Sequence, residues 1–161
     1  MFLRKINMDD ISVLEKLIID NGIKDTAVVD IKRKGKWVEI TIFRYNLPVT
    51  VEDCAEVTRI FSNSEEVSNL FGEDCVIAVA SPGIGRKLTT SREMEIFTGQ
   101  EIIATWNKPD DNILYKTEAV LTNYDETGIT VQNKENLLKL TWQDIKSIHL
   151  SEKEEKIRGE L

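Results

Sequence analysis

The sequence predicts an α+β N-terminal domain, with two helices on a three-stranded sheet, followed by an all-β small barrel. Two observations lead to this fold class. Before residue 80, apolar residues at helical spacing alternate with runs of β-branched residues. After residue 100, five short strand-like runs follow one another, separated by turn sequences rather than helices. We therefore divide the chain into 1–82, 83–150 and a charged tail at 151–161 without an apolar face.

Two helices are predicted in the first domain. In the segment MDDISVLEKLIIDNG, four apolar residues share one helical face: Ile11, Leu14, Leu17 and Ile18. Asp9 or Asp10 is expected to cap the start of this helix, and Gly22 to provide its left-handed stop. The second helix is predicted to begin after the N-cap Thr50, with Cys54 facing the sheet as part of the core.

The three strands of the first domain are predicted from two β-branched runs and one apolar run. The runs TAVVDIKR and WVEITIFR flank the basic turn KRKGK and predict a hairpin. In the second run, residues of two kinds alternate with a period of two: Val38, Ile40 and Ile42 against Trp37, Glu39, Thr41 and Phe43. The polar stretch SNSEEVSNLFGED then leads to the third strand, CVIAVAS.

The barrel is predicted from EIIATW, YKTEAVLTNY, GITVQN, LLKLTW and IKSIHL. Strands this short and this closely spaced favour a small barrel over an open sheet. A short helix is predicted before them in TTSREMEIFTG. Thr90 and Glu93 have the spacing of a capping box, and Gly99 is expected to end this helix.

Composition and charge narrow the classes of function. No apolar run approaches the roughly 20 residues that cross a bilayer, so we expect a cytoplasmic protein with no membrane partner. The net charge is −7, and both halves of the chain carry an excess of acidic residues. This argues against a protein that coats nucleic acid with positive charge, but it permits a local RNA-binding patch or a basic protein partner.

Residues suited to catalysis or metal binding are few. Cys54 and Cys75 are isolated from one another, and His149 is the single histidine. No set of zinc ligands with recognisable spacing is present, and a Ser-His-Asp or Cys-His arrangement would depend on that one histidine. We therefore expect no catalytic residues, no metal and no cofactor.

The segment AVASPGIGRKL separates the two predicted domains. Its two glycines and two following cations suggest a phosphate-binding loop, but no glycine stands three residues beyond Gly85 and no Walker sequence is present. A structural role is the simpler interpretation, because Pro82 stops a strand and Gly83 can adopt a positive φ. The predicted interdomain junction consists of Ser81, Pro82, Gly83 and Gly85.

This junction resembles that of the bacterial ribosome maturation factor RimP family. The shared pattern is a strand, Ser-Pro-Gly-Ile/Leu-x-Arg-x-Leu and a short helix ending in Phe-x-Gly. The matching residues are Ser81, Pro82, Gly83, Ile84, Arg86, Leu88, Phe97 and Gly99. VTVEDCAEVTR is similar to the start of the family's second helix. The chain departs at Gly85 and Lys87, where members usually carry Asp and Pro.

The resemblance implies a non-enzymatic protein whose second domain is an SH3-like (Sm-like) barrel. It implies binding to the free 30S small ribosomal subunit, and assistance with the central region of its rRNA and with incorporation of the decoding-centre ribosomal protein. A monomer without a small-molecule substrate is expected. The candidate ribosome and RNA contacts are the cations of the hairpin turn and the junction: Lys32, Arg33, Lys34, Lys36, Arg86, Lys87 and Arg92.

Two other classes remain open. A general RNA-binding Sm-like module would stack bases on aromatic rings, and four residues of the barrel could supply them: Trp106, Tyr115, Tyr124 and Trp142. Aromatic residues in a small barrel more often fill its core. An enzyme using the loop from Gly83 to Lys87 would be stabilised against heat by a nucleotide, and we expect no such effect.

Overall fold

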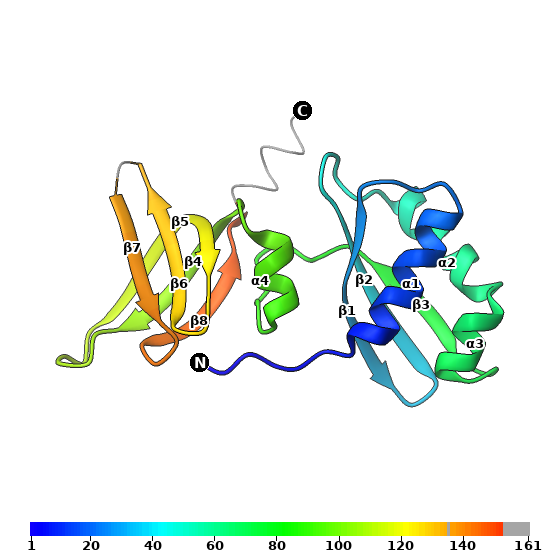
Figure 1. Cartoon of the computed structure of the whole chain (residues 1–161), viewed down its shortest axis with the longest axis horizontal. Helices are drawn as coiled ribbons and strands as arrows, with labels where there is room; N and C mark the ends of the chain where they lie inside the picture. The colour runs from blue at the N-terminus through cyan, green and yellow to red at the C-terminus, as the bar shows by residue number, and fades with distance from the viewer. Residues whose placement is uncertain (135, 153–161) are drawn as a thin grey trace. The chain divides into compact units, whose positions relative to one another are not determined.

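The computed structural model describes residues 1–134 and 136–152, which form two compact units (Figure 1). One unit is Ile6–Pro82, and the other combines Met1–Lys5 with the residues from Gly83 on. The predicted charged tail lies outside the described residues from position 153. A search of the described helices finds none with the length and apolar character to span a membrane.

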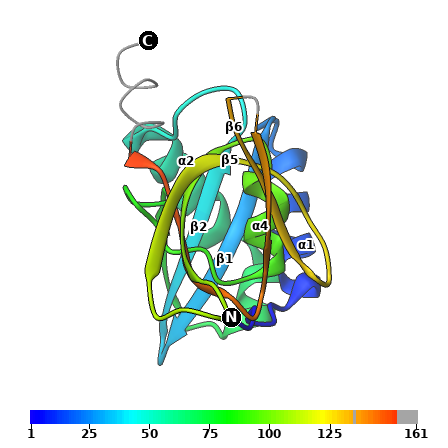
Figure 2. The same ribbon diagram turned by 90° about the vertical axis from the view of Figure 1, so that its left-hand side faces the viewer.

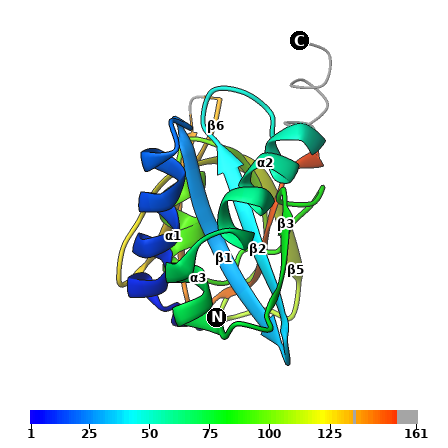
Figure 3. The same cartoon turned by 90° about the vertical axis from the view of Figure 1, so that its right-hand side faces the viewer.

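The first unit is built from three helices and a three-stranded sheet. In chain order its elements are α1 (Met8–Asp20), β1 (Thr26–Lys34), β2 (Trp37–Arg44), α2 (Val51–Ser62), α3 (Glu65–Phe71) and β3 (Val76–Ala80). β1 and β2 are antiparallel and β3 is parallel to β2, in the order β1-β2-β3. The helices cover one face of the sheet (Figure 3). Their apolar sides and the strand residues Val28, Val38, Ile40 and Ile42 form the core.

α3 is a helix that the sequence analysis did not predict. Ser64 caps its start, because the Ser64 hydroxyl accepts a hydrogen bond from the Val67 amide at 3.4 Å. Val67 and Phe71 are buried and stand four residues apart, as neighbours on one helical face do. With seven mostly polar residues, α3 is too short to give a clear helical period. The prediction of two helices was therefore wrong by one.

The first helix begins differently from the prediction. Asn7, not Asp9 or Asp10, is its N-cap, and the Asn7 side chain accepts hydrogen bonds from the Asp9 and Asp10 amides at 3.1 and 3.2 Å. The two aspartates instead occupy the first turn, where negative charge is favourable. Gly22 has a φ of 84°, and the N-cap Thr50 is confirmed.

Asp53 links the start of α2 to β2 and predicts a dependence of stability on pH. Its carboxylate accepts a hydrogen bond from the Thr50 amide at 2.9 Å and lies 3.4 Å from the Arg44 guanidinium. Burial opposes ionisation, but the bonds from Thr50 and the charge of Arg44 outweigh it and lower the pKa of Asp53 below 3.8. The ionised form is thus favoured by folding. Its contribution is present above pH 3.8 and is lost as the pH falls through the lowered folded-state pKa.

We expect Asp53→Asn to lower the free energy of unfolding by about 1 kcal/mol at neutral pH. The difference from the unchanged protein should shrink as the pH falls below 3.8, because both proteins then carry a neutral group at this position. Urea unfolding across this pH range measures it. A difference that stays constant with pH would contradict the role given to the ionised carboxylate.

The second unit contains one helix and five strands. They are α4 (Ser91–Phe97), β4 (Glu101–Asn107), β5 (Leu114–Tyr124), β6 (Gly128–Asn133), β7 (Asn136–Thr141) and β8 (Ile145–Leu150). All five predicted strands are present, and α4 begins with the predicted capping box of Thr90 and Glu93. Gly99 has a φ of 95°. The α+β class is confirmed.

The five strands form one antiparallel sheet in the order β7-β6-β5-β4-β8. The sheet is curved (Figure 2), with register shifts in β4 and β5. β7 and β8 are the ends of the strand order, so the described pairing is that of an open sheet and not of the closed barrel predicted. Beyond β8, the Leu88 amide donates to the Ile148 carbonyl at 2.8 Å, and the Leu150 amide donates to the Arg86 carbonyl at 2.9 Å.

The segment Met1–Lys5 belongs with the second unit, although the sequence analysis grouped it with the first domain. The Arg4 amide donates to the Thr89 carbonyl at 2.6 Å, and Arg4 Nε donates to the Thr89 hydroxyl at 3.0 Å. The chain therefore passes between the two units twice, after Lys5 and after Pro82.

Candidate nucleic-acid interface

The alternation of β1 sends the cations of the hairpin to opposite faces of the sheet. Arg33 pairs with Val38, a core residue, so Arg33 lies on the face that the helices cover. Lys32 pairs with Glu39 and Lys34 with Trp37, which places both lysines on the other face. These cations of the basic turn therefore form two separate groups, one on each face of the sheet.

Arg33 interacts with the end of α3, and Lys36 interacts with the segment that joins α3 to β3. Arg33 donates to the Phe71 carbonyl at 2.7 Å, and its guanidinium lies 5.8 Å from the centre of the Phe71 ring. It closes the last turn of α3, where carbonyl groups lack partners within the helix. Lys36 lies 3.6 Å from Asp74, but both side chains are at least 75% exposed, and a pair this open contributes about 1 kcal/mol at most.

Lys32 and Lys34 are exposed, and their side chains carry no hydrogen bond or ion pair within the part of the chain that the structure describes. Their ammonium groups are therefore available to a partner. Of the four cations of the hairpin, these two best fit a contact with phosphate.

The junction turns at Gly85 rather than at Gly83. The Arg86 amide donates to the Gly83 carbonyl at 3.2 Å, and Gly85 has a φ of 66°. Gly83 has no positive φ, so the turn does not use the conformational freedom that a glycine offers at this position. Ser81 is exposed and Pro82 is buried. Gly85 accommodates a left-handed backbone that a residue with a side chain would adopt only at a cost.

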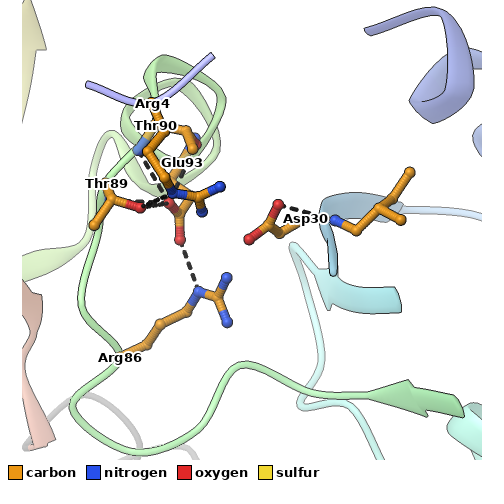
Figure 4. Close-up of polar contacts among 7 residues, drawn as sticks. Arg4, Asp30, Arg86, Thr89, Thr90 and Glu93 are labelled. Atoms are coloured by element: carbon orange, nitrogen blue, oxygen red, sulfur yellow. Dashed lines mark hydrogen bonds and ion pairs between the residues drawn. The ribbon is translucent and has the colours of Figure 1, made fainter. Parts of the chain in front are cut away.

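Arg86 and Glu93 form a buried ion pair (Figure 4). Arg86 Nε donates to one carboxylate oxygen of Glu93 at 2.7 Å. The other oxygen accepts from the Thr89 and Thr90 amides at 2.9 and 3.1 Å. Glu93 is fully buried and the Arg86 side chain is only 14% exposed. The sequence predicted the capping role of Glu93, but not that this carboxylate would neutralise Arg86.

The other two cations of the junction differ from each other. Arg92 lies 3.9 Å from Glu95 and its side chain is only 11% exposed. Lys87 is exposed, and its backbone forms an antiparallel bridge with His149. Lys87 is thus the junction cation best placed to reach a partner, whereas Arg86 stabilises the second unit.

The aromatic residues of the second unit are engaged within it. The rings of Trp106 and Tyr115 stack with their centres 4.7 Å apart, and the Trp106 indole N–H donates to the Thr117 hydroxyl at 3.0 Å. The Trp142 indole N–H donates to the Asp125 carbonyl at 2.9 Å. These contacts hold the three rings in place, and all three side chains are half-buried rather than part of the core.

The remaining reactive side chains show no catalytic arrangement among the described residues. Cys54 and Cys75 are free thiols, and burial, together with the charge of Asp53, raises the pKa of Cys54 and makes it a poor nucleophile. His149 lines a shallow hollow of about 250 Å³ with Lys116 and Glu152. Within the described ranges, no group of three or more His, Cys, Asp or Glu side chains is arranged to hold a metal ion.

The fold and the charge define the class of this protein: it is an acidic α+β protein with a few isolated, exposed lysines. No protein-family model matches the chain. The chain is 24% identical, over 103 residues or 64% of its length, to the ribosome maturation factor RimP of Prochlorococcus marinus (strain MIT 9211). The match covers 66% of that relative, slightly less than two thirds. This distant similarity agrees with the resemblance carried by the junction.

Proposed function

We propose that the protein is a non-enzymatic ribosome maturation factor of the cytoplasm, which binds the free 30S small ribosomal subunit as a monomer. It assists formation of the central region of the rRNA and incorporation of the basic decoding-centre ribosomal protein. The observation that carries the proposal is the similarity to the RimP of Prochlorococcus marinus. The Ser-Pro-Gly junction and the curved five-stranded sheet, which we assign to the SH3-like class, support it.

Electrostatics supports two kinds of contact with such a particle. The chain carries a net charge of −7, which favours approach to a basic ribosomal protein. Lys32, Lys34 and Lys87 are exposed cations that attract the phosphates of rRNA. Arg33, Arg86 and Arg92 have protein partners, so their main contribution is to hold the units in shape.

Cosedimentation with isolated small subunits, isolated large subunits and assembled ribosomes tests the proposal. We expect retention on free small subunits only, because the protein would recognise a surface that assembly later occupies. Retention on large subunits to the same extent, or no retention on small subunits, would contradict it. Equal affinity for an unstructured RNA would instead indicate a general RNA-binding module.

A further inference from the structure

The helix-free face of the first sheet carries an exposed tryptophan beside two lysines. Trp37 begins β2, and half of its surface is exposed. Lys34 stands directly opposite it on β1, and Lys32 lies two residues away on the same face. On its other side, Trp37 is paired in register with Val76 of β3, which is 48% exposed. We call these four residues the Trp37 platform.

We propose that the Trp37 platform binds an unpaired nucleotide of RNA, with the base stacked on the indole and the neighbouring phosphates on Lys32 and Lys34. The choice of rRNA as the source rests on the proposed function. The stacking surface itself rests on the geometry of the hairpin. Trp37 was not among the aromatic residues that the sequence analysis considered for bases.

Trp37 differs from the other two tryptophans in its contacts. Trp106 and Trp142 each donate an indole N–H to a protein acceptor. The Trp37 side chain has no hydrogen bond, aromatic stacking or cation–π contact with any residue that the structure describes. Lys34 on β1 and Val76 on β3 stand directly beside Trp37 in the sheet. Hydrogen bonds to both neighbouring strands hold the Trp37 backbone in place. The ring is therefore a flat apolar surface on a rigid support.

The charge around the ring favours an anionic partner. Lys32 and Lys34 stand two residues apart on one strand, about 7 Å along it, and both are unpaired among the described residues. An aromatic face beside cations fits a nucleotide, because the base stacks while the phosphate neutralises the lysines. Glu39, opposite Lys32, adds one negative charge at the edge of the platform. A basic protein would meet two like charges here, which makes it the less favourable occupant.

Substitutions at Trp37 separate stacking from general hydrophobic contact in titrations of small subunits. We expect Trp37→Phe to keep affinity within about threefold, because phenylalanine still has a π face. Trp37→Leu and Trp37→Ala should both weaken binding by roughly 5- to 100-fold without changing the slope of log affinity against log salt. Leu137→Ala, an apolar side chain 68% exposed on β7, is the matched control and should change nothing.

Substitutions of the two lysines should change the salt dependence of binding, unlike the substitutions of Trp37. Replacing Lys32 and Lys34 by alanine should flatten the salt slope by roughly 0.7 for each phosphate that no longer meets a lysine. Lys24→Ala, at an exposed lysine just before the other end of β1, should leave the slope unchanged. Glu39→Gln should strengthen binding by about two- to threefold, because it removes a like charge near the phosphate.

The outcomes distinguish failure of the platform from failure of the proposed function. If Trp37→Ala binds small subunits like the unchanged protein, or if Trp37→Leu matches Trp37→Phe, the platform is wrong and the maturation factor stands. If no form binds small subunits, the proposed function is wrong. In that case, quenching of Trp37 fluorescence alone by a uridine 12-mer would still support the platform. Weaker affinity of the Trp37 variants for an isolated basic ribosomal protein, with binding to the 12-mer unchanged, would overturn the platform in favour of a protein partner.

Discussion

Replacing Glu93 by alanine is expected to lower the free energy of unfolding of the second unit by about 3 to 5 kcal/mol. The substitution removes the carboxylate that neutralises Arg86 and leaves a largely buried guanidinium without that charge partner. It also removes the acceptor of the Thr89 and Thr90 amides, which directly precede α4. Each buried donor without a partner adds a cost of about 1 to 3 kcal/mol. Urea unfolding followed by tryptophan fluorescence measures the effect.

Glu95→Ala is the matched control in the same helix. Its carboxylate is 64% exposed and lies 3.9 Å from Arg92, so its removal should cost less than about 0.5 kcal/mol. Glu93→Gln should cost an intermediate amount, because its amide oxygen still accepts from the backbone but no longer neutralises Arg86. If Glu93→Ala and Glu95→Ala are equally mild, Arg86 and Glu93 are not a buried pair in solution.

Gly128→Ala is expected to be the second strongly destabilising change, at about 3 kcal/mol or more. Gly128 begins β6 opposite Thr141 of β7. A β-carbon at this position would lie 1.9 Å from the Leu140 carbonyl oxygen and 2.8 Å from the Thr141 α-carbon. Both are backbone atoms, so the clash cannot be relieved by rotating a side chain. The strands β6 and β7 would have to separate at this end.

Gly83→Ala provides the contrast. A β-carbon at Gly83 would meet no atom within 4 Å, and its φ is not positive. We expect no decrease in stability there, or a gain of about 0.4 to 1 kcal/mol from the lower entropy of the unfolded chain. Unfolding measurements on both variants test the pair. Equal effects at the two positions would contradict the close approach of β6 and β7.

Local sequence signals predicted most of the secondary structure. The five strands of the second unit were each marked by apolar or β-branched runs between turns. The N-cap Thr50 marked the start of α2, and the capping box of Thr90 and Glu93 marked the start of α4. The cap of α1 was wrong because Asn7, Asp9 and Asp10 are all good capping residues, and the sequence does not show which of them adopts an extended backbone. α3 was missed because three apolar residues within one seven-residue segment are too few to establish a period.

The candidate interface could be predicted only in part. The sequence located the cations, but which of them are available depends on strand register and on the partners that the fold brings to them. Arg33 is held by Phe71, 38 residues away, and Arg86 by a glutamate seven residues away. Trp37 gave a signal that could have been used, since in WVEITIFR it falls on the side of the alternation opposite the core residues Val38, Ile40 and Ile42. Closure of the second sheet was beyond local sequence, because it depends on pairing between distant strands.

The hydrogen bonds between Arg4 and Thr89 affect the order in which the two units can fold during translation. Domains generally fold as they leave the ribosome, and Ile6–Pro82 is complete as soon as its last strand has emerged. Arg4 must wait, because its partner is made 85 residues later. Arg4 is therefore translated before Ile6–Pro82 but reaches its native neighbours after that unit can fold, once Thr89 has been made.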